Sequence, residues 1–219
     1  FVAILGAQAE VAGTSGEPVF KPFTFLDPSS SFSGVERIAL FVVLAIAGAG
    51  LLYALMLVGQ VRKADQGTKK MQEIAQAVRE GANAYLKAQF GKIAPLMVII
   101  AILLYFTASS SNPWFHWGRS IAFLVGASFS WLGGFVGMRL ATQGNLRVAA
   151  AARTSYGSAL QLGYRTGTIT GMLTDGLGLL GGTLIFMMFG ESAYEALLGF
   201  GFGGTLLALF MRVGGGIYT

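Results

Sequence analysis

Long apolar runs alternate with polar and basic stretches along this chain. The apolar runs cover residues 38–59, 93–107, 121–138, 166–190 and 197–219, and single charges interrupt only the last two of them. A helix rises about 1.5 Å per residue, so about 20 residues cross the roughly 30 Å hydrocarbon layer of a membrane. The pattern therefore predicts an all-α, polytopic transmembrane helix bundle of about five helices.

The second run continues an amphipathic segment. Within residues 71–90, apolar side chains recur at helical spacing on one face: Met71, Ile74, Ala75, Val78, Ala82, Tyr85 and Leu86. We expect one helix to continue from this segment through residues 93–107. Pro95 lies inside the pattern, and a proline in a membrane helix kinks the helix rather than ending it.

The basic residues predict the orientation. Lysine and arginine concentrate in residues 61–92 and 139–165, which we interpret as cytoplasmic loops, with a helix favoured at the alanine-rich residues 148–152. Three further stretches hold few cations and are expected outside: residues 1–37, 108–120 and 190–196. The N-terminus is therefore expected outside, as is an outer loop at 108–120 whose aromatic side chains form an interfacial belt.

Composition supports a membrane protein. Of the 219 residues, 54% are hydrophobic and 11% are charged, about half the charged fraction of a soluble domain. The net charge of +5 is confined to the basic stretches and does not indicate nucleic-acid binding. The absence of cysteine from the sequence excludes disulfides and thiolate metal sites.

Residues 1–36 are expected to form a loop-like segment outside the membrane, since they contain Pro18, Pro22 and Pro28 and several serines. Residues 1–9 have two interpretations. They match the end of a signal peptide with an A-x-A cleavage site, or they are an ordinary stretch of small residues.

Arg212 is the strongest candidate for a functional residue. It lies about fifteen residues into the last apolar run, at membrane depth, where an arginine costs at least about 2.5 kcal/mol and normally faces a partner or a wet cavity. No acid in that run can neutralise it, so a partner is expected from elsewhere. Thr205 is seven residues earlier on the same helix face, which suggests a polar pathway. A structural salt bridge is the alternative.

Two acids are weaker candidates for an ion path. Asp175 lies at membrane depth. The alternatives for an acid there are to bind a cation, to relay protons or to pair with a neighbouring helix. Glu195 lies at the outer mouth of the last hairpin. It is either an ion-exit group or a solvated turn residue. The closely spaced glycines, including the GLGLLG stretch at 176–181, indicate tight helix packing, because that stretch follows no strand.

Four stretches together resemble the membrane-integral pyrophosphatases, which pump protons or sodium. The resemblance covers residues 37–219 and is carried by residues 203–219, by 70–75 with 80–86, by 137–142 with Asn145, Arg147 and 149–152, and by 171–172 with 176–181. It implies sixteen helices in two concentric rings, of which residues 37–219 supply helices one to five, and a homodimer.

The resemblance implies hydrolysis of Mg²⁺-pyrophosphate at the cytoplasmic side coupled to outward transport of H⁺ or Na⁺; it leaves open which cation moves and whether K⁺ is also required. Arg212 matches the family's coupling-region arginine, and Glu195 matches an acid near the outer end of the same helix. Thr205 stands where the family has a small or hydroxyl residue, and Asp175 matches no family-wide position. The acidic substrate motif begins beyond Thr219, so no catalytic or metal-binding residue is expected in this chain.

Two other functions fit the residues alone. One is a non-catalytic membrane subunit of a larger complex, packed through its glycine faces. The other is a fragment of a secondary transporter, which predicts a repeat of the five-span pattern. For the pump, the partners are pyrophosphate, membrane lipid and the remaining transmembrane helices, and an N-terminus outside suits a bacterial inner membrane.

Overall fold

The computed structural model describes residues 22–23, 25, 32–107 and 113–218. Within these ranges the chain is helical and contains no strand, in agreement with the predicted all-α class. The signal-peptide interpretation of residues 1–9 and most of the outer segment 1–36 lie outside the described residues.

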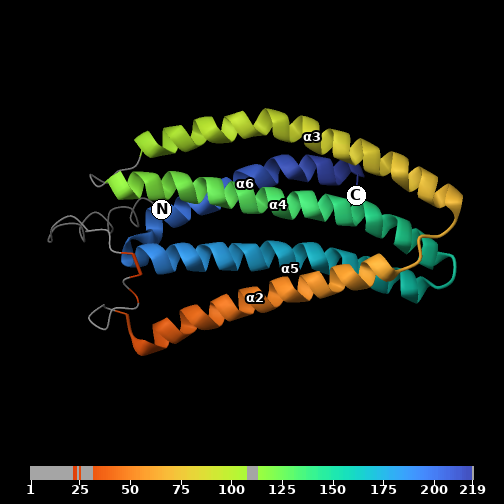
Figure 1. The fold of residues 1–219 in the computed structure, drawn as a ribbon, viewed down its shortest axis with the longest axis horizontal. Helices are drawn as coiled ribbons and strands as arrows, with labels where there is room; N and C mark the ends of the chain where they lie inside the picture. Colours follow the sequence, from red (N-terminus) through yellow and green to blue (C-terminus); the bar gives the residue numbers. More distant parts are fainter. Residues whose placement is uncertain (1–21, 24, 26–31, 108–112, 219) are drawn as a thin grey trace, which may run out of the picture.

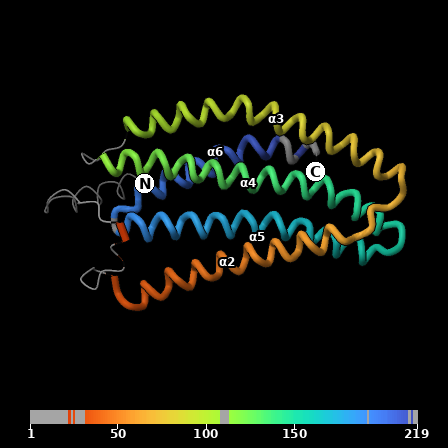
Figure 2. The backbone as a smooth tube through the Cα atoms, viewed as in Figure 1, coloured from red at the N-terminus to blue at the C-terminus, as the bar shows by residue number. Residues whose placement is uncertain are grey.

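Five long helices run back and forth through the bundle (Figures 1 and 2). They are α2 (Gly34–Lys63), α3 (Lys69–Phe106), α4 (Pro113–Ala152), α5 (Tyr156–Phe189) and α6 (Ala193–Tyr218), with a short 3₁₀ turn, η2 (Gly190–Ser192), before α6. Each of the five described helices is long and apolar enough to cross a membrane, which confirms the predicted transmembrane bundle.

Local sequence determines where several helices begin. Ser33 caps α2 in a reciprocal pair with Glu36, because the Ser33 hydroxyl accepts from the Glu36 N–H while the Glu36 carboxylate accepts from the Ser33 N–H. The side chains of Thr68 and Ser155 cap α3 and α5 in the simpler one-way manner. At the end of α5, Gly190 has a φ of 58°, which favours glycine.

The helix boundaries correct two of the predicted loops. The outer loop expected at 108–120 is helical from Pro113 onward, because proline is favourable in the first turn and the ring of Trp117 packs 5.0 Å from that of Tyr105 at the end of α3. The basic stretch 139–165 is not a loop either. Helix α4 continues to Ala152, which confirms the helix favoured at 148–152, and α5 begins at Tyr156, so residues 153–155 alone connect them. Residues 69–92 likewise belong to α3, which passes through Pro95 as predicted.

Helix α4 lies at the centre of the bundle and contacts α3, α5 and α6, while α2 packs mainly on α5. One buried apolar cluster joins α3, α4 and α6, and a second joins α2, α4 and α5. Many large apolar side chains remain exposed, including Ile38, Leu52 and Leu55 on α2. Such a surface suits a lipid or protein environment rather than water.

Backbone contact through glycine holds α4 and α6 together. A Cβ atom on Gly199 would meet the carbonyl oxygen of Arg119, and one on Gly203 would meet that of Phe123. A Cβ on Gly126 would meet the carbonyl oxygen of Phe200 in the same way. These contacts confirm the prediction of tight glycine packing for this helix pair, whereas Gly178, Gly182 and Gly201 have no atom within 4 Å of an added Cβ.

Candidate functional site

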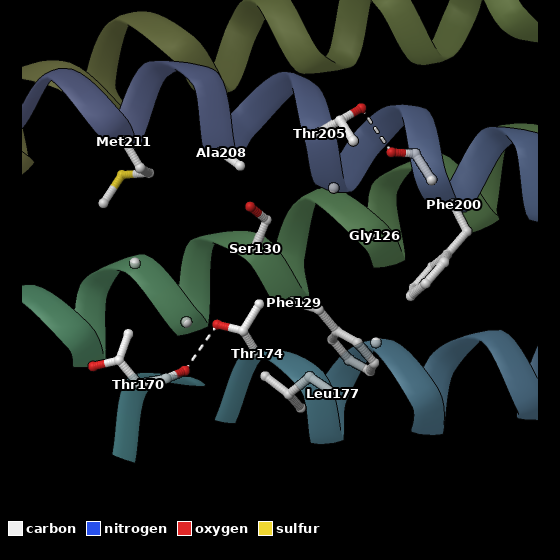
Figure 3. A pocket seen from close by; sticks show the side chains of 15 residues that line it. Gly126, Phe129, Ser130, Thr170, Thr174, Leu177, Phe200, Thr205, Ala208 and Met211 are labelled. Atoms are coloured by element: carbon white, nitrogen blue, oxygen red, sulfur yellow. Dashed lines mark hydrogen bonds between the residues drawn. The ribbon is translucent and has the colours of Figure 1, made fainter. Parts of the chain in front are cut away.

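A groove lies between α4, α5 and α6. It consists of two adjoining cavities of about 420 Å³ and 350 Å³, which share the lining residues Gly133, Gly134, Thr170 and Met211. Figure 3 shows Ala208 and Met211 directed from α6 toward α4, with Thr170, Thr174 and Leu177 on α5. The glycines on α4 leave this space open because they carry no side chain. We call this space the three-helix groove.

Apart from Arg212, the polar side chains that line the three-helix groove carry hydroxyls. Thr205 donates to the Gly201 carbonyl oxygen at 2.8 Å, and Thr174 donates to the Thr170 carbonyl oxygen at 2.9 Å (Figure 3). Each of these two hydroxyl protons is thus taken up by its own helix, which leaves the oxygen lone pairs as acceptors toward the groove. Thr205 therefore lines the first cavity of the groove, and its part in a polar pathway with Arg212 stays a prediction.

Arg212 lines the second cavity, near the C-terminal end of α6, together with Gly137, Met138 and Ala141. Its side chain is exposed, and among the described residues it forms no ion pair. The neutralising acid expected from elsewhere is therefore not supplied by the part of the chain that the structure describes. That Arg212 acts in ion coupling stays a prediction.

Glu195 lies in the first turn of α6, half-buried, and its Oε2 atom is buried without a hydrogen-bond partner. A carboxylate there is favoured by the helix dipole. At about 1.5 Å per residue it is about 15 Å from Thr205 along α6 and about 25 Å from Arg212. The structure therefore places these three residues on one helix without bringing them together.

Asp175 is exposed on α5 and is not among the residues that line the groove. Its neighbour Gly176 faces α2, where an added Cβ would come within 2.8 Å of the Leu51 side chain. Asp175 therefore stands apart from Thr205 and Arg212, and its role in an ion path stays untested. Within residues 32–107 and 113–218 there is also no group of three or more His, Asp or Glu side chains that could hold a metal ion.

Gln89 is a connecting residue that the sequence analysis did not single out. Its Nε2 donates to the backbone carbonyl oxygen of Phe210 at 2.6 Å, which links α3 to α6 two residues before Arg212. Its Oε1 atom is buried without a partner. The sequence did contain a signal for this contact, because Gln89 is a polar residue on the mainly apolar helix face of residues 71–90.

Arg147 is a second connecting residue, which the sequence analysis used for the family resemblance without giving it a role. Helix α4 has 40 residues, about 60 Å, so its last turns extend beyond the hydrocarbon layer, and Arg147 lies in that extension. The side chain is buried; Nη1 donates to the Gln143 carbonyl oxygen at 3.0 Å and Nη2 to the Arg62 carbonyl oxygen at 3.3 Å. Burial lowers the pKa of Arg147, and the charges of Arg79 and Arg62 lower it further.

Comparison with known proteins gives consistent matches. The family described as "Inorganic H+ pyrophosphatase" matches residues 48–219. A "K(+)-insensitive pyrophosphate-energized proton pump" of Chloroflexus aurantiacus is 49% identical over 203 residues, which is 85% of this chain and 26% of that protein. Proteins of the same description from Streptomyces avermitilis and Methanosarcina mazei are 40% and 39% identical, over 90% and 77% of this chain and 27% and 24% of their own lengths. The chain thus spans about a quarter of the length of these curated relatives.

Proposed function

Because this chain belongs to the inorganic H⁺ pyrophosphatase family, we propose that it forms the N-terminal part of a membrane pump that couples pyrophosphate hydrolysis to outward proton transport. The observation that carries this proposal is the family match, which extends from the middle of α2 through α6. The relatives' names favour the proton over sodium and favour activity without K⁺. In this proposal Mg²⁺ accompanies the substrate and is held by residues outside the described helices.

The role of these helices in the proposed pump is coupling rather than hydrolysis. Arg212 is the cation at the cytoplasmic end of a groove lined otherwise by hydroxyl and apolar groups. A guanidinium favours the ionised form of a nearby carboxylate. Acids on the remaining helices of the complete protein would pair with Arg212, and a shift of these helices during hydrolysis would change which acid holds the proton.

Exposed apolar side chains on α3 and α6 bear on how the complete protein assembles. Phe106 on α3 and Leu209 and Val213 on α6 are more than half exposed, and we expect further helices of the same protein to cover the α6 face. We further propose a homodimer in the bacterial inner membrane with the N-terminus outside. Cross-linking of the detergent-solubilised complete protein, followed by mass measurement, tests the dimer directly.

The test of the pump uses the complete protein reconstituted in sealed vesicles. We expect Mg²⁺-dependent pyrophosphate hydrolysis accompanied by acidification of the vesicle interior, without a requirement for Na⁺ or K⁺. Arg212→Ala is expected to reduce the protons moved per pyrophosphate by at least about tenfold, because the acids that pair with Arg212 lose the charge that favours their ionised form. Arg212→Lys, which keeps the charge, is expected to recover part of the transport.

The matched control is Arg153→Ala, which removes an exposed cation from the connection between α4 and α5. It is expected to leave the ratio of transport to hydrolysis unchanged. Full transport in Arg212→Ala would remove Arg212 from the coupling step while leaving the pump itself intact. Absence of pyrophosphate hydrolysis in the unmodified complete protein would refute the proposed function.

A further inference from the structure

Three arginines from three helices gather at the basic end of the bundle. Arg62 belongs to the last turn of α2, Arg79 to the early part of α3 and Arg147 to the late part of α4. The Arg147 guanidinium reaches the backbone of Arg62 at 3.3 Å, and the charges of Arg79 and Arg62 both act on it. We call this group the arginine cluster.

The acids near the arginine cluster are engaged elsewhere. Among the described residues, none of the three guanidinium groups forms an ion pair. Asp65 accepts from the Gly67 N–H in the loop between α2 and α3. Glu80 accepts from Gln76 at 2.9 Å, and Gln76 in turn accepts from Arg79 at 3.5 Å, so an amide separates that carboxylate from the arginine. The cluster therefore keeps a net positive charge.

The cluster also holds donors that lack acceptors. The Nε atoms of Arg79 and Arg147 are buried without a hydrogen-bond partner, and a buried donor left unsatisfied is unfavourable. These two atoms are closed to solvent, so a ligand would bind the outer nitrogens of Arg62 and Arg79 and offset the charge from there. A phosphate group suits such nitrogens, because its oxygens accept several hydrogen bonds from guanidinium groups and carry negative charge.

The depth of the cluster places it where phosphate groups are abundant. Helix α2 has 30 residues and begins at its Ser33 cap, and about 20 residues cross the hydrocarbon layer, so Arg62 lies past the hydrocarbon edge in the headgroup region. Cytoplasmic leaflets are rich in anionic lipid, and basic residues near such a surface are attracted to it.

We infer that Arg62, Arg79 and Arg147 form a binding site for a phosphate group, carried either by an anionic lipid headgroup or by a soluble phosphate. The buried Arg147 fixes the site to the end of α2, while Arg62 is exposed and Arg79 partly exposed, so their outer nitrogens face the ligand. The site lies outside the three-helix groove and is independent of the proposed pump activity.

The experiment measures binding in the complete protein rather than activity. The protein is placed in bilayer discs of phosphatidylcholine alone or with one fifth phosphatidylglycerol, and bound lipid is counted by native mass spectrometry after release. A parallel arm measures thermal stabilisation by inorganic phosphate in uncharged detergent. The test variant is Arg62→Gln with Arg79→Gln, which leaves the buried Arg147 in place so that α2 stays anchored. Arg153→Gln is the matched control.

Retention of phosphatidylglycerol by the unmodified protein and by Arg153→Gln, with at least a tenfold loss in the double variant, supports a lipid-bound phosphate. Stabilisation by inorganic phosphate that disappears in the double variant supports a soluble one. Equal retention and equal stabilisation in the double variant and the unmodified protein would overturn the inference, as would the absence of both effects from the unmodified protein. A folded double variant is verified by its unchanged helical circular dichroism.

Discussion

Arg147 donates from both terminal nitrogens, one to its own helix and one to the carbonyl oxygen of Arg62 on α2. The last carbonyls of a helix have no partner within the helix, and a cation beside them also interacts favourably with the helix dipole. Arg147 is therefore a side-chain cap for the end of α2 supplied by α4. A lysine could reach one such oxygen, whereas the planar guanidinium reaches two in fixed directions.

Arg147→Met is expected to destabilise the protein. It removes two hydrogen bonds from a charged donor, each worth about 1.5–3 kcal/mol, and leaves the Arg62 carbonyl without this partner. Thermal unfolding in detergent, followed by circular dichroism, should show a lower midpoint. Arg153→Met, at an exposed position, should leave the midpoint unchanged. An equal midpoint for both variants would contradict the capping role.

From the sequence alone, a residue could be singled out where placing it in the membrane is energetically costly. A residue whose role depends on contacts between helices could not. Arg212 could be singled out because an arginine in an apolar run is unusual whatever surrounds it. Arg147 lies in a basic stretch among other arginines, so nothing in its own position distinguished it. Its burial and its partner on α2 depend on the packing of two helices distant in sequence. Gln89 and its Phe210 contact were missed for the same reason.

The helices themselves were predictable, and their ends were not. Hydropathy located the five spans because each must be apolar over the membrane thickness. It could not show that α4 and α5 continue for several turns past the membrane, since polar residues there are compatible with either helix or loop. Close packing of Gly144 on the side chain of Thr166 holds these extensions together, and that contact is not visible in hydropathy.

Gly203→Ala is expected to separate α4 from α6. Its Cβ would collide with the Phe123 carbonyl oxygen, so the main chain must shift, at a cost of about 1–3 kcal/mol. The midpoint of thermal unfolding should fall. The matched control is Gly48→Ala in α2, where nothing lies within 4 Å of the added atom, and there the higher helix propensity of alanine should stabilise by up to about 1 kcal/mol. A raised midpoint in both variants would exclude close α4–α6 contact.

At the scale of the whole molecule, charge divides the bundle into two ends. The described connections between α2 and α3 and between α4 and α5 lie at one end, and the start of α2 and the turn before α6 lie at the other (Figure 1). Lysine and arginine concentrate at the first end, which sets the proposed orientation. The net positive charge of this chain therefore comes from the basic residues that set its proposed orientation in the membrane.

Single introduced cysteines test this orientation, since the 219 residues contain none of their own. Val35→Cys, at a position 78% exposed near the start of α2, should react with a membrane-impermeant maleimide in intact cells. Gln66→Cys, in the loop between α2 and α3, should react after the cells are opened. Any cysteine elsewhere in the complete protein is replaced first. The reverse labelling pattern would place the N-terminus in the cytoplasm.

Pro95 has a mechanical consequence for α3. It has no N–H to donate, so the Gly91 carbonyl lacks the partner that an uninterrupted helix would give it. Bending at this point breaks no backbone hydrogen bond, and Gly91 has no atom within 4 Å of where its Cβ would lie. A bend of α3 between residues 91 and 95 would therefore cost little in backbone hydrogen bonds, although the helix is continuous over Lys69–Phe106. Gln89 lies just before this point and is hydrogen-bonded to Phe210, so such a bend would displace the Phe210 turn of α6 with it.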